Sequence, residues 1–269
     1  MQEATLVILI GPAMPRFAAN TAYLFADRPL IERFGAAAKA GFTAVEGQFP
    51  YDTPASAVKA ELTRHNLTML GINTERGGEG LFGLAAMPGR EREFDALMKQ
   101  SLDYITAIGG SAIHCLAGKV PVNERPAAER VYVANLMRAA DMAAEKNIVI
   151  LIEPINPRDR PDYFLNRPEH AADIIAKAGK PNIKIQFDFY HAQIVGGDLM
   201  KRFEAHLPLV GHVQIAAVPS RHEPDEGEVN YPAIYQMLDA VGYKGWVAAE
   251  YFPRGKTEDG LGWLRAAQK

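Results

Sequence analysis

The sequence predicts an α/β protein built as a single (β/α)₈ TIM barrel. Its 269 residues match the length of one such barrel, which typically runs to about 250 residues. Short β-type runs alternate with helical patterns along the whole chain, and this texture does not change between the two halves, which favours a closed barrel over an open sheet. A doubly wound sheet would usually carry a glycine fingerprint after its first strand, and none is present there.

Eight short runs rich in apolar and β-branched residues are the expected strands. The run at 148–153 is apolar up to its last residue, as a strand covered on both faces should be. The expected strands are residues 17–20, 43–46, 67–72, 112–116, 148–153, 183–188, 210–215 and 246–250.

Helical patterns fill the intervals between these runs. For the first helix, Asp27 is the expected N-cap, Pro29 lies in the first turn and Gly41 ends the helix. A glycine-rich loop at 73–89 precedes a helix that Gly109 closes. After the fourth strand, one helix is expected to bury Val133, Leu136, Met137, Ala140 and Ala144 on one face. Further helices are expected to begin near Thr53, Pro168, Asp198, Asn230 and Thr257.

The bulk composition points to a small-molecule partner. A formal net charge of −3 gives no electrostatic footprint for nucleic acid or an anionic membrane. No apolar run approaches the roughly 18 residues of a membrane helix. One cysteine, Cys115, excludes an internal disulfide and suits a reducing cytosol. We therefore expect a cytoplasmic protein without nucleic-acid or membrane partners.

The first 13 residues are not expected to belong to the barrel. They contain an apolar stretch at 6–10, but they lack a basic start, carry Glu3 and have a short apolar core, so a signal peptide is not expected. We interpret residues 1–13 as a leader or disordered extension, with an additional edge strand as the alternative, and residues 14–269 as the catalytic domain.

Oxygen-bearing side chains recur at the ends of four successive expected strands. These residues are Glu153, Asp188, Gln214 and Glu250, with separations of 35, 26 and 36 residues, each close to one βαβ unit of roughly 30 residues. The carboxyl ends of the strands form the active-site face of such a barrel. The spacing therefore predicts that the four side chains meet there.

Their chemistry indicates a divalent metal site. Each acid taken alone can be a capping or ion-paired carboxylate, but three neighbouring carboxylates repel one another and lose hydration when buried. A bound cation removes both problems. Three carboxylates and one amide, without cysteine, suit Mg²⁺, Mn²⁺ or Co²⁺. We expect Glu153, Asp188, Gln214 and Glu250 to be the metal ligands.

Several longer segments resemble the hydroxypyruvate isomerase family, which belongs to the xylose-isomerase-like TIM barrels. The resemblance covers the chain from about Met14 to its end. It implies an isomerase that interconverts hydroxypyruvate and tartronate semialdehyde, and homo-oligomers are common among such enzymes. The segments that carry it are residues 17–20, 49–52, 151–156, 186–191, 212–216, 221–224, 227–231 and 245–251.

The resemblance also implies roles for individual residues. Glu153 and Glu250 would be the catalytic base and acid that move a proton through an enediolate, in an order the sequence leaves open. His191, Arg221 and Glu46 are the expected substrate-binding residues. His191 would donate to a substrate oxygen, with a purely structural histidine as the alternative. Arg221 would pair with the substrate carboxylate, with a solvated arginine as the alternative.

Glu46 would orient either the substrate or a metal ligand. His114 and Cys115 end the fourth strand and are expected in the core. Arg158 and Asp159 follow the fifth strand and are further candidates for substrate contact.

Two loops depart from the family pattern and leave the substrate open. The loop at 73–80 is unusual, and Gly47-Gln48 replaces bulkier apolar residues. The alternatives are a 2-oxo-tetronate isomerase, a ketose 3-epimerase, in which histidine usually replaces Gln214, and a metal-dependent apurinic endonuclease. An endonuclease needs a basic groove and additional zinc ligands. A non-enzymatic binding protein would leave the four-residue pattern unexplained.

Overall fold

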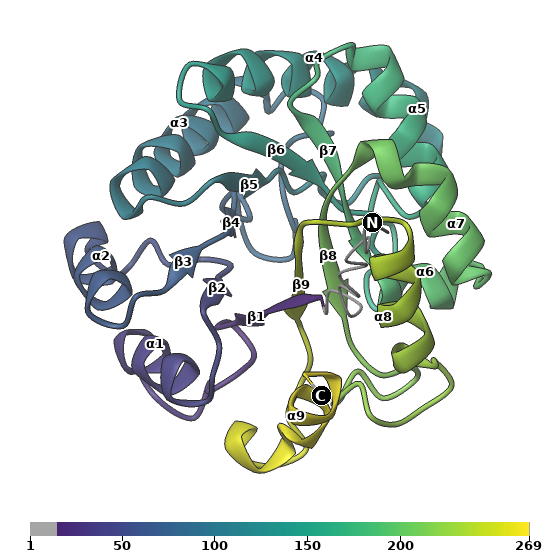
Figure 1. The fold of residues 1–269 in the computed structure, drawn as a ribbon. Coiled ribbons are helices and arrows are strands. Elements are labelled where there is room, and N and C mark those ends of the chain that lie inside the picture. Colours follow the sequence, from purple (N-terminus) through teal and green to yellow (C-terminus); the bar gives the residue numbers. More distant parts are fainter. Residues whose placement is uncertain (1–14, 269) are drawn as a thin grey trace, which may run out of the picture.

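Parallel strands close into a barrel in the computed structural model, which describes residues 15–268 (Figure 1). The strands follow the order β3-β2-β1-β9-β8-β7-β6-β5-β4 around the barrel, and the predicted fold class is confirmed. The leader interpretation for residues 1–13 lies outside the described residues. The strands are β1 Arg16–Asn20, β2 Ala44–Glu46, β3 Thr68–Met69, β4 Gly71–Asn73, β5 Ala112–His114, β6 Val149–Ile152, β7 Ile183–Asp188, β8 Val210–Ile215 and β9 Trp246–Ala249.

The predicted strand at 67–72 is divided into β3 and β4, so nine strands occupy eight barrel positions. β3 pairs with β2, and β4 pairs with β5. Leu70 joins the two pieces, because its backbone N–H donates to Val45 on one side (2.8 Å) and its carbonyl accepts from the N–H of Ser111 on the other (3.2 Å). The break is therefore a change of partner within one barrel position.

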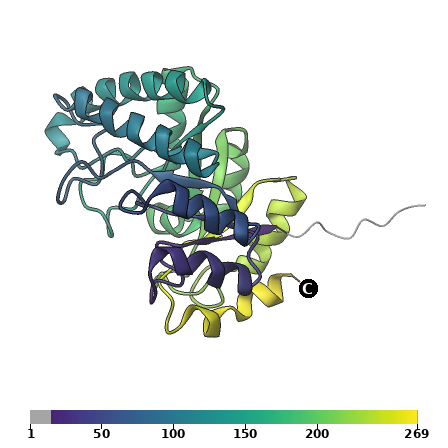
Figure 2. The ribbon, with the colours of Figure 1, turned by 90° about the vertical axis from the view of Figure 1, so that its left-hand side faces the viewer.

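Helices surround the barrel, and those of the first half lie side by side on its outer surface (Figure 2). Among the residues that the structure describes, no helix combines the length and the apolarity needed to cross a membrane. The helices are α1 Leu30–Lys39, α2 Ala55–Arg64, α3 Glu91–Ile108, α4 Arg125–Ala144, α5 Pro168–Ala178, α6 Phe189–Val195, α7 Leu199–His206, α8 Tyr231–Ala240 and α9 Gly262–Ala267, with short 3₁₀ turns η1 Val122–Glu124, η2 Leu207–Leu209 and η3 Thr257–Gly260.

Two details of the predicted helices are wrong. Asp27 does not cap α1, because the helix begins only after Pro29, and the Asp27 carboxylate accepts from Arg28 instead. In α4, Met137 is 38% exposed and Ala144 is also exposed. Tyr132 is instead fully buried and packs edge-on against Phe164. The buried face of α4 carries Tyr132 together with Leu136 and Ala140.

The sequence also gave no sign of α6, which follows β7 without a loop. Asp188 ends β7 and caps α6, because its carboxylate accepts a hydrogen bond from the backbone N–H of Tyr190 at 2.7 Å. The acid predicted as a metal ligand thus also starts the helix that carries His191.

The barrel interior holds both apolar and polar side chains. A small apolar group consists of Ala18, Ala44, Leu70 and Ala248. Buried polar side chains lie in the same interior and include Glu46, His114, Gln186, His212 and Gln214. Together with Leu70, these polar side chains line one cavity inside the barrel.

The loop at 73–89 is held against the segment that follows β5. The N–H of Ala86 donates to the carbonyl of Ala117 (2.8 Å), and the N–H of Lys119 donates to the carbonyl of Leu81 (3.0 Å). Gly83 has φ +117°, and a Cβ there would lie 2.1 Å from the carbonyl oxygen of Leu116. Only glycine fits this close approach.

We expect Gly83→Ala to destabilise the fold by about 3 kcal/mol, because backbone strain and the clash with Leu116 add together. Gly89→Ala is the matched control, since Gly89 also has positive φ (+82°) but has open space around its Cβ position. The control should cost only about 1 kcal/mol. Urea denaturation measures both values, and equal losses would contradict the role assigned to the contact with Leu116.

Candidate active site

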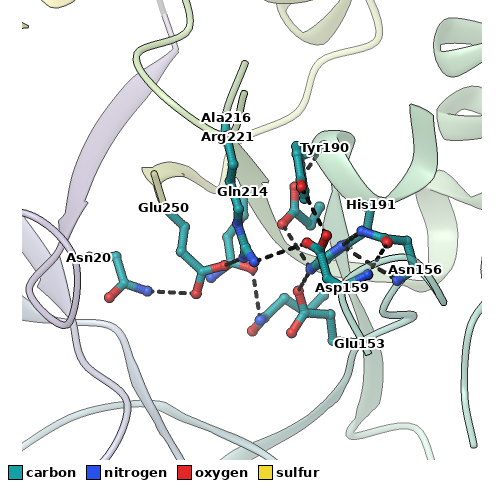
Figure 3. Close-up of polar contacts among 12 residues, drawn as sticks. Asn20, Glu153, Asn156, Asp159, Tyr190, His191, Gln214, Ala216, Arg221 and Glu250 are labelled. Carbon is teal, nitrogen blue, oxygen red and sulfur yellow. Dashed lines mark hydrogen bonds and ion pairs between the residues drawn. The ribbon is translucent and has the colours of Figure 1, made fainter. Parts of the chain in front are cut away.

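The four predicted oxygen ligands gather at the carboxyl end of the barrel. Figure 3 shows Glu153, Gln214 and Glu250 together with Arg221. Glu153 directly follows β6, Asp188 ends β7, Gln214 lies in β8, and Glu250 directly follows β9. All four are at least 95% buried. These residues are distant in sequence, but they lie together because the parallel strands of a barrel all end on one face.

Glu153 and Asp188 each present one oxygen without a partner. Glu153 Oε1 and Asp188 Oδ2 are buried and have no hydrogen bond among the described residues. His191 Nε2 lies 3.6 Å from each of these two oxygens. Ligand atoms of the three residues all lie within 4.8 Å of one another. This buried group is consistent with a metal site, because unpaired carboxylate oxygens are the donors that a divalent cation requires.

The hydrogen bonds of His191 assign its proton to the nitrogen that faces the acids. The backbone N–H of Asn156 donates to Nδ1 at 3.4 Å, and Asn156 Nδ2 lies 2.7 Å from the same atom. Because Nδ1 accepts, the proton of the neutral ring is on Nε2. Burial lowers the pKa of His191 well below its ordinary value, which keeps the ring neutral. In this tautomer His191 offers an N–H to an oxygen between Glu153 and Asp188.

Buried negative charge dominates the electrostatics at Glu153 and Asp188. Burial, with Glu250 and Asp188 nearby, raises the pKa of Glu153 well above its usual range. Burial also raises the pKa of Asp188 to about 6, although Arg221 acts in the opposite direction. Two acids in this state hold protons readily or gain strongly from a cation. The unpaired oxygens and the raised pKa values therefore fit a divalent ion held by Glu153 and Asp188.

Glu250 has protein partners on both carboxylate oxygens. Its Oε1 accepts from Asn20 Nδ2 (2.9 Å) and Gln48 Nε2 (3.0 Å), and its Oε2 accepts from Arg221 Nη2 (2.8 Å). Burial still raises the pKa of Glu250 to about 7, against the opposing charge of Arg221. This carboxyl group is suited to exchanging a proton near neutral pH. Its role as a metal ligand stays a prediction.

Arg221 lies inside the site, and carboxylates already surround it. Besides Glu250, it contacts Asp159 Oδ2 at 3.4 Å. Its guanidinium lies over the rings of Tyr190 (4.9 Å) and Tyr23 (5.4 Å). The charge of Arg221 is therefore largely used in holding Glu250. Its predicted contact with a substrate carboxylate stays a prediction.

Glu46 lies beneath the site and orients Gln214. Its carboxylate accepts from Gln214 Nε2 (2.6 Å), Asn20 Nδ2 (2.7 Å) and His212 Nε2. Burial alone would raise the pKa of Glu46, but the charge of His212 and these hydrogen bonds outweigh it and lower the pKa. Glu46 lines a cavity of about 120 Å³ inside the barrel, separate from the cavity that Glu153 and Glu250 line. This placement favours the second predicted role of Glu46, orienting a ligand.

Gln214 is held by hydrogen bonds at both ends of its amide. Besides donating to Glu46, it accepts from Gln186 Nε2 at 2.8 Å. An amide oxygen has a second lone pair, so the predicted ligand role of Gln214 remains chemically open.

His114 and Cys115 are both buried, as predicted. Cys115 packs in the core, but His114 also lines the site cavity, and its Nδ1 lies 3.4 Å from Glu153 Oε2. Burial lowers the pKa of His114 to about 3, so this ring is neutral beside Glu153.

The cavity above the acids is small, about 80 Å³, well below the size of sites for drug-like molecules. The sequence analysis assigns no role to Gln48, Arg76 or Arg160 in its lining, nor to Asn20, which donates to Glu250. Asn20 ends the first strand, so the strand-end rule could have found it, and Gln48 is noted only as a departure from the family pattern. Arg76 is noted only as part of the unusual loop at 73–80, and nothing in the sequence singles out Arg160, whose position depends on loop folding. The lining comprises Tyr23, Gln48, Phe49, Asn73, Arg76, Phe82, His114, Leu116, Glu153, Ile155, Arg160, His191, Arg221 and Glu250.

Comparison with known proteins first defines the class of the fold. The family of xylose isomerase-like TIM barrels matches residues 34–267. A crystal structure from Brucella melitensis described as an AP endonuclease of family 2 is 44% identical, with a TM-score of 0.92, and the match covers 94% of this chain and 99% of that chain. A 3-keto-D-glucoside 4-epimerase from Escherichia coli, 22% identical with a TM-score of 0.81 over 94% of this chain and 99% of that chain, shares the fold.

Curated relatives then define the family within this class. A 2-oxo-tetronate isomerase of Cupriavidus necator is 45% identical over 94% of this chain and 98% of its own. The hydroxypyruvate isomerase of Escherichia coli is 38% identical over 93% of this chain and 98% of its own. The chain belongs to the hydroxypyruvate isomerase and 2-oxo-tetronate isomerase family of xylose isomerase-like TIM barrels. It is an isomerase of this type, and the predicted family resemblance is confirmed.

We expect Mn²⁺ to bind more tightly as the pH rises from 6 to 8. The raised pKa values of Glu153 and Asp188 mean that protons occupy these carboxyl groups at low pH, and the ion must displace them. Each released proton changes the affinity by roughly 10-fold per pH unit below the pKa of its group. The rise in melting temperature on adding Mn²⁺ measures the effect.

Glu153→Gln should remove the Mn²⁺-dependent rise in melting temperature. Glu129→Gln should preserve it, because Glu129 pairs with Lys177 on the surface. An equal Mn²⁺ effect at pH 6 and pH 8, or an effect that survives in Glu153→Gln, would contradict the assignment of the metal to this carboxylate pair.

Proposed function

We propose that the protein isomerises short hydroxy-oxo acids by moving a proton between adjacent carbons through an enediolate, with hydroxypyruvate converted to tartronate semialdehyde. The observation that carries the proposal is a pair of buried carboxyl groups with raised pKa, Glu153 and Glu250, that line the same small cavity. A carboxyl group whose pKa approaches the working pH can both take and return a proton.

The reaction requires one base and one acid next to the substrate. One carboxylate takes a proton from the CH₂OH carbon of hydroxypyruvate, and a proton returns to the neighbouring carbon that carried the carbonyl group. The hydroxyl proton of the first carbon moves to the oxygen of the second, so atoms and electrons balance. Glu153 and Glu250 are suited to the carbon-bound protons, because both line the cavity.

The other residues of the site support this transfer. His191 Nε2–H is placed to donate to a substrate oxygen near Glu153 and Asp188. Arg221 fixes the orientation of Glu250 through its 2.8 Å contact. Glu153 and Asp188 would hold a divalent cation, which would supply positive charge to the substrate oxygens. Gln214, oriented by Glu46, is the proposed neutral ligand, and Mg²⁺, Mn²⁺ or Co²⁺ suits this oxygen-rich set.

A four-carbon acid is the second candidate substrate. The relatives from Cupriavidus necator and Pectobacterium atrosepticum, 45% and 44% identical, are named 2-oxo-tetronate isomerases. The unusual loop at 73–80 borders the cavity through Asn73 and Arg76, so it can adapt the site to a longer acid. Cleavage of abasic DNA has less support, because within residues 15–268 only one group of His, Cys, Asp or Glu side chains is arranged to hold a metal.

We expect Glu250→Gln to lower kcat for hydroxypyruvate by about 10²- to 10⁴-fold, because the amide cannot take or return a proton. Glu228→Gln is the matched control, since Glu228 is exposed and accepts only a surface hydrogen bond from Gln193. Turnover by the Mn²⁺-loaded protein, with circular dichroism to check the fold, measures the effect.

Comparable turnover in Glu250→Gln and the wild type would contradict the proposed role of Glu250 in proton transfer. Wild-type turnover of 2-oxo-tetronate but not of hydroxypyruvate would select the four-carbon acid. Cleavage of abasic-site DNA without turnover of either acid would overturn the isomerase proposal.

A further inference from the structure

Three basic side chains gather around one aromatic ring at the entrance of the cavity. The guanidinium of Arg160 lies 4.3 Å from the centre of the Phe82 ring, and Lys119 Nζ lies 5.2 Å from it. Arg76 lies 5.8 Å from the same ring and 4.3 Å from the ring of Phe49. Positive charge is therefore concentrated around Phe82, which lines the cavity together with Arg76 and Arg160.

The two arginines of this group carry charge that the protein does not neutralise. Within residues 15–268, no carboxylate lies within ion-pair distance of either Arg76 or Arg160. The polar contact of Arg160 is a hydrogen bond from Nη1 to the backbone carbonyl of Asp159 at 2.9 Å. Arg221 differs from both, because it contacts the carboxylates of Glu250 and Asp159. An anion that enters the cavity meets free guanidinium groups at Arg76 and Arg160.

Aromatic stacking orders these guanidinium groups without cancelling their charge. A ring face attracts the flat side of a guanidinium and leaves its N–H edge available for hydrogen bonds. The backbone holds Phe82 in place, because the N–H of Gly83 donates to the carbonyl of Arg76 at 2.9 Å and the N–H of Lys119 donates to that of Leu81 at 3.0 Å. The loop thus presents Arg76 and Phe82 as one unit.

Arg160 is placed by the same residue that orients His191. The backbone N–H of Arg160 donates to the carbonyl of Asn156 at 3.1 Å, while the Asn156 side chain contacts His191 Nδ1 at 2.7 Å. Both Arg160 and His191 line the cavity. Asn156 therefore links the backbone of Arg160 to the ring that faces Glu153 and Asp188.

We infer that Arg76 and Arg160 bind the carboxylate of the substrate and thereby select hydroxy-oxo acids over neutral sugars. This inference rests on the proposed isomerisation of such acids and moves the predicted carboxylate contact away from Arg221. Guanidinium groups suit this task, because their N–H edge matches the two oxygens of a carboxylate.

Lys119 provides a matched control within the same group. It lies near the Phe82 ring, as the two arginines do, but it does not line the cavity. Removal of its charge changes the local field without removing a group that contacts the ligand.

The test compares two ligands with the same carbon skeleton, hydroxypyruvate and dihydroxyacetone, in which CH₂OH replaces the carboxylate. Isothermal titration calorimetry measures the binding of each to Mn²⁺-loaded wild type, Arg76→Gln, Arg160→Gln and Lys119→Gln. We expect the wild type to prefer the acid by at least about 10-fold. Each arginine variant should weaken binding of the acid by roughly 10-fold and leave dihydroxyacetone within about twofold. Lys119→Gln should leave both affinities within about twofold.

Arginine variants that keep wild-type affinity for the acid, or that lose both ligands equally, would overturn the inference. An equal loss of affinity for the acid in Lys119→Gln would mean that the general positive field binds the acid. This result would also overturn the inference. Tighter arginine-dependent binding of dihydroxyacetone phosphate than of hydroxypyruvate would assign these groups to a phosphate ester instead.

The binding measurement does not depend on turnover, so it separates this inference from the proposed function. Arginine-dependent preference for the acid without isomerisation would support the carboxylate site and overturn the proposed reaction. Isomerisation with unchanged affinity in both arginine variants would support the proposed reaction and overturn the carboxylate site.

Discussion

Buried negative charge at one end of the barrel is the constraint on which the site depends. Four acids are buried there, Glu46, Glu153, Asp188 and Glu250. Two of them have protein partners for their charge, and two do not. His212 and three hydrogen bonds keep Glu46 ionised, and Arg221 pairs with Glu250. Glu153 and Asp188 keep unpaired oxygens, with a neutral His191 beside them. The network satisfies two acids and leaves two available, which is the state that cation binding requires.

The sequence predicted the meeting of the strand-end residues because that meeting follows from topology alone. Parallel strands in a barrel end on one face, so Glu153, Asp188 and Glu250 had to converge. The division at Leu70 and the short helix α6 were not predictable in the same way. The division reflects a change of neighbours across the barrel, and α6 begins without the loop that usually separates a strand from a helix. Both depend on contacts between segments far apart in the sequence.

The partners of the arginine side chains could not be predicted from the sequence. Arg221 follows the seventh expected strand and was a natural partner for a substrate carboxylate. In the fold, Arg221 adopts φ 57°, and its carbonyl accepts from the N–H of Phe252, which turns its side chain toward Glu250. Arg76 and Arg160 lie in loops with no periodic pattern. Their position beside Phe82 arises from loop packing, so no motif or spacing could have identified them.

Asn20 joins parts of the site that are synthesised at different times. It lies on β1, which pairs with β9, and its side chain donates to both Glu46 and Glu250. The strands β1 and β9 therefore meet beside Glu250, the residue proposed to transfer a proton. During synthesis, Glu153 and Asp188 exist well before Glu250, but the finished arrangement needs the last strand to close on the first. The hydrogen bond between Asn20 and Glu250 therefore forms only when the barrel has closed.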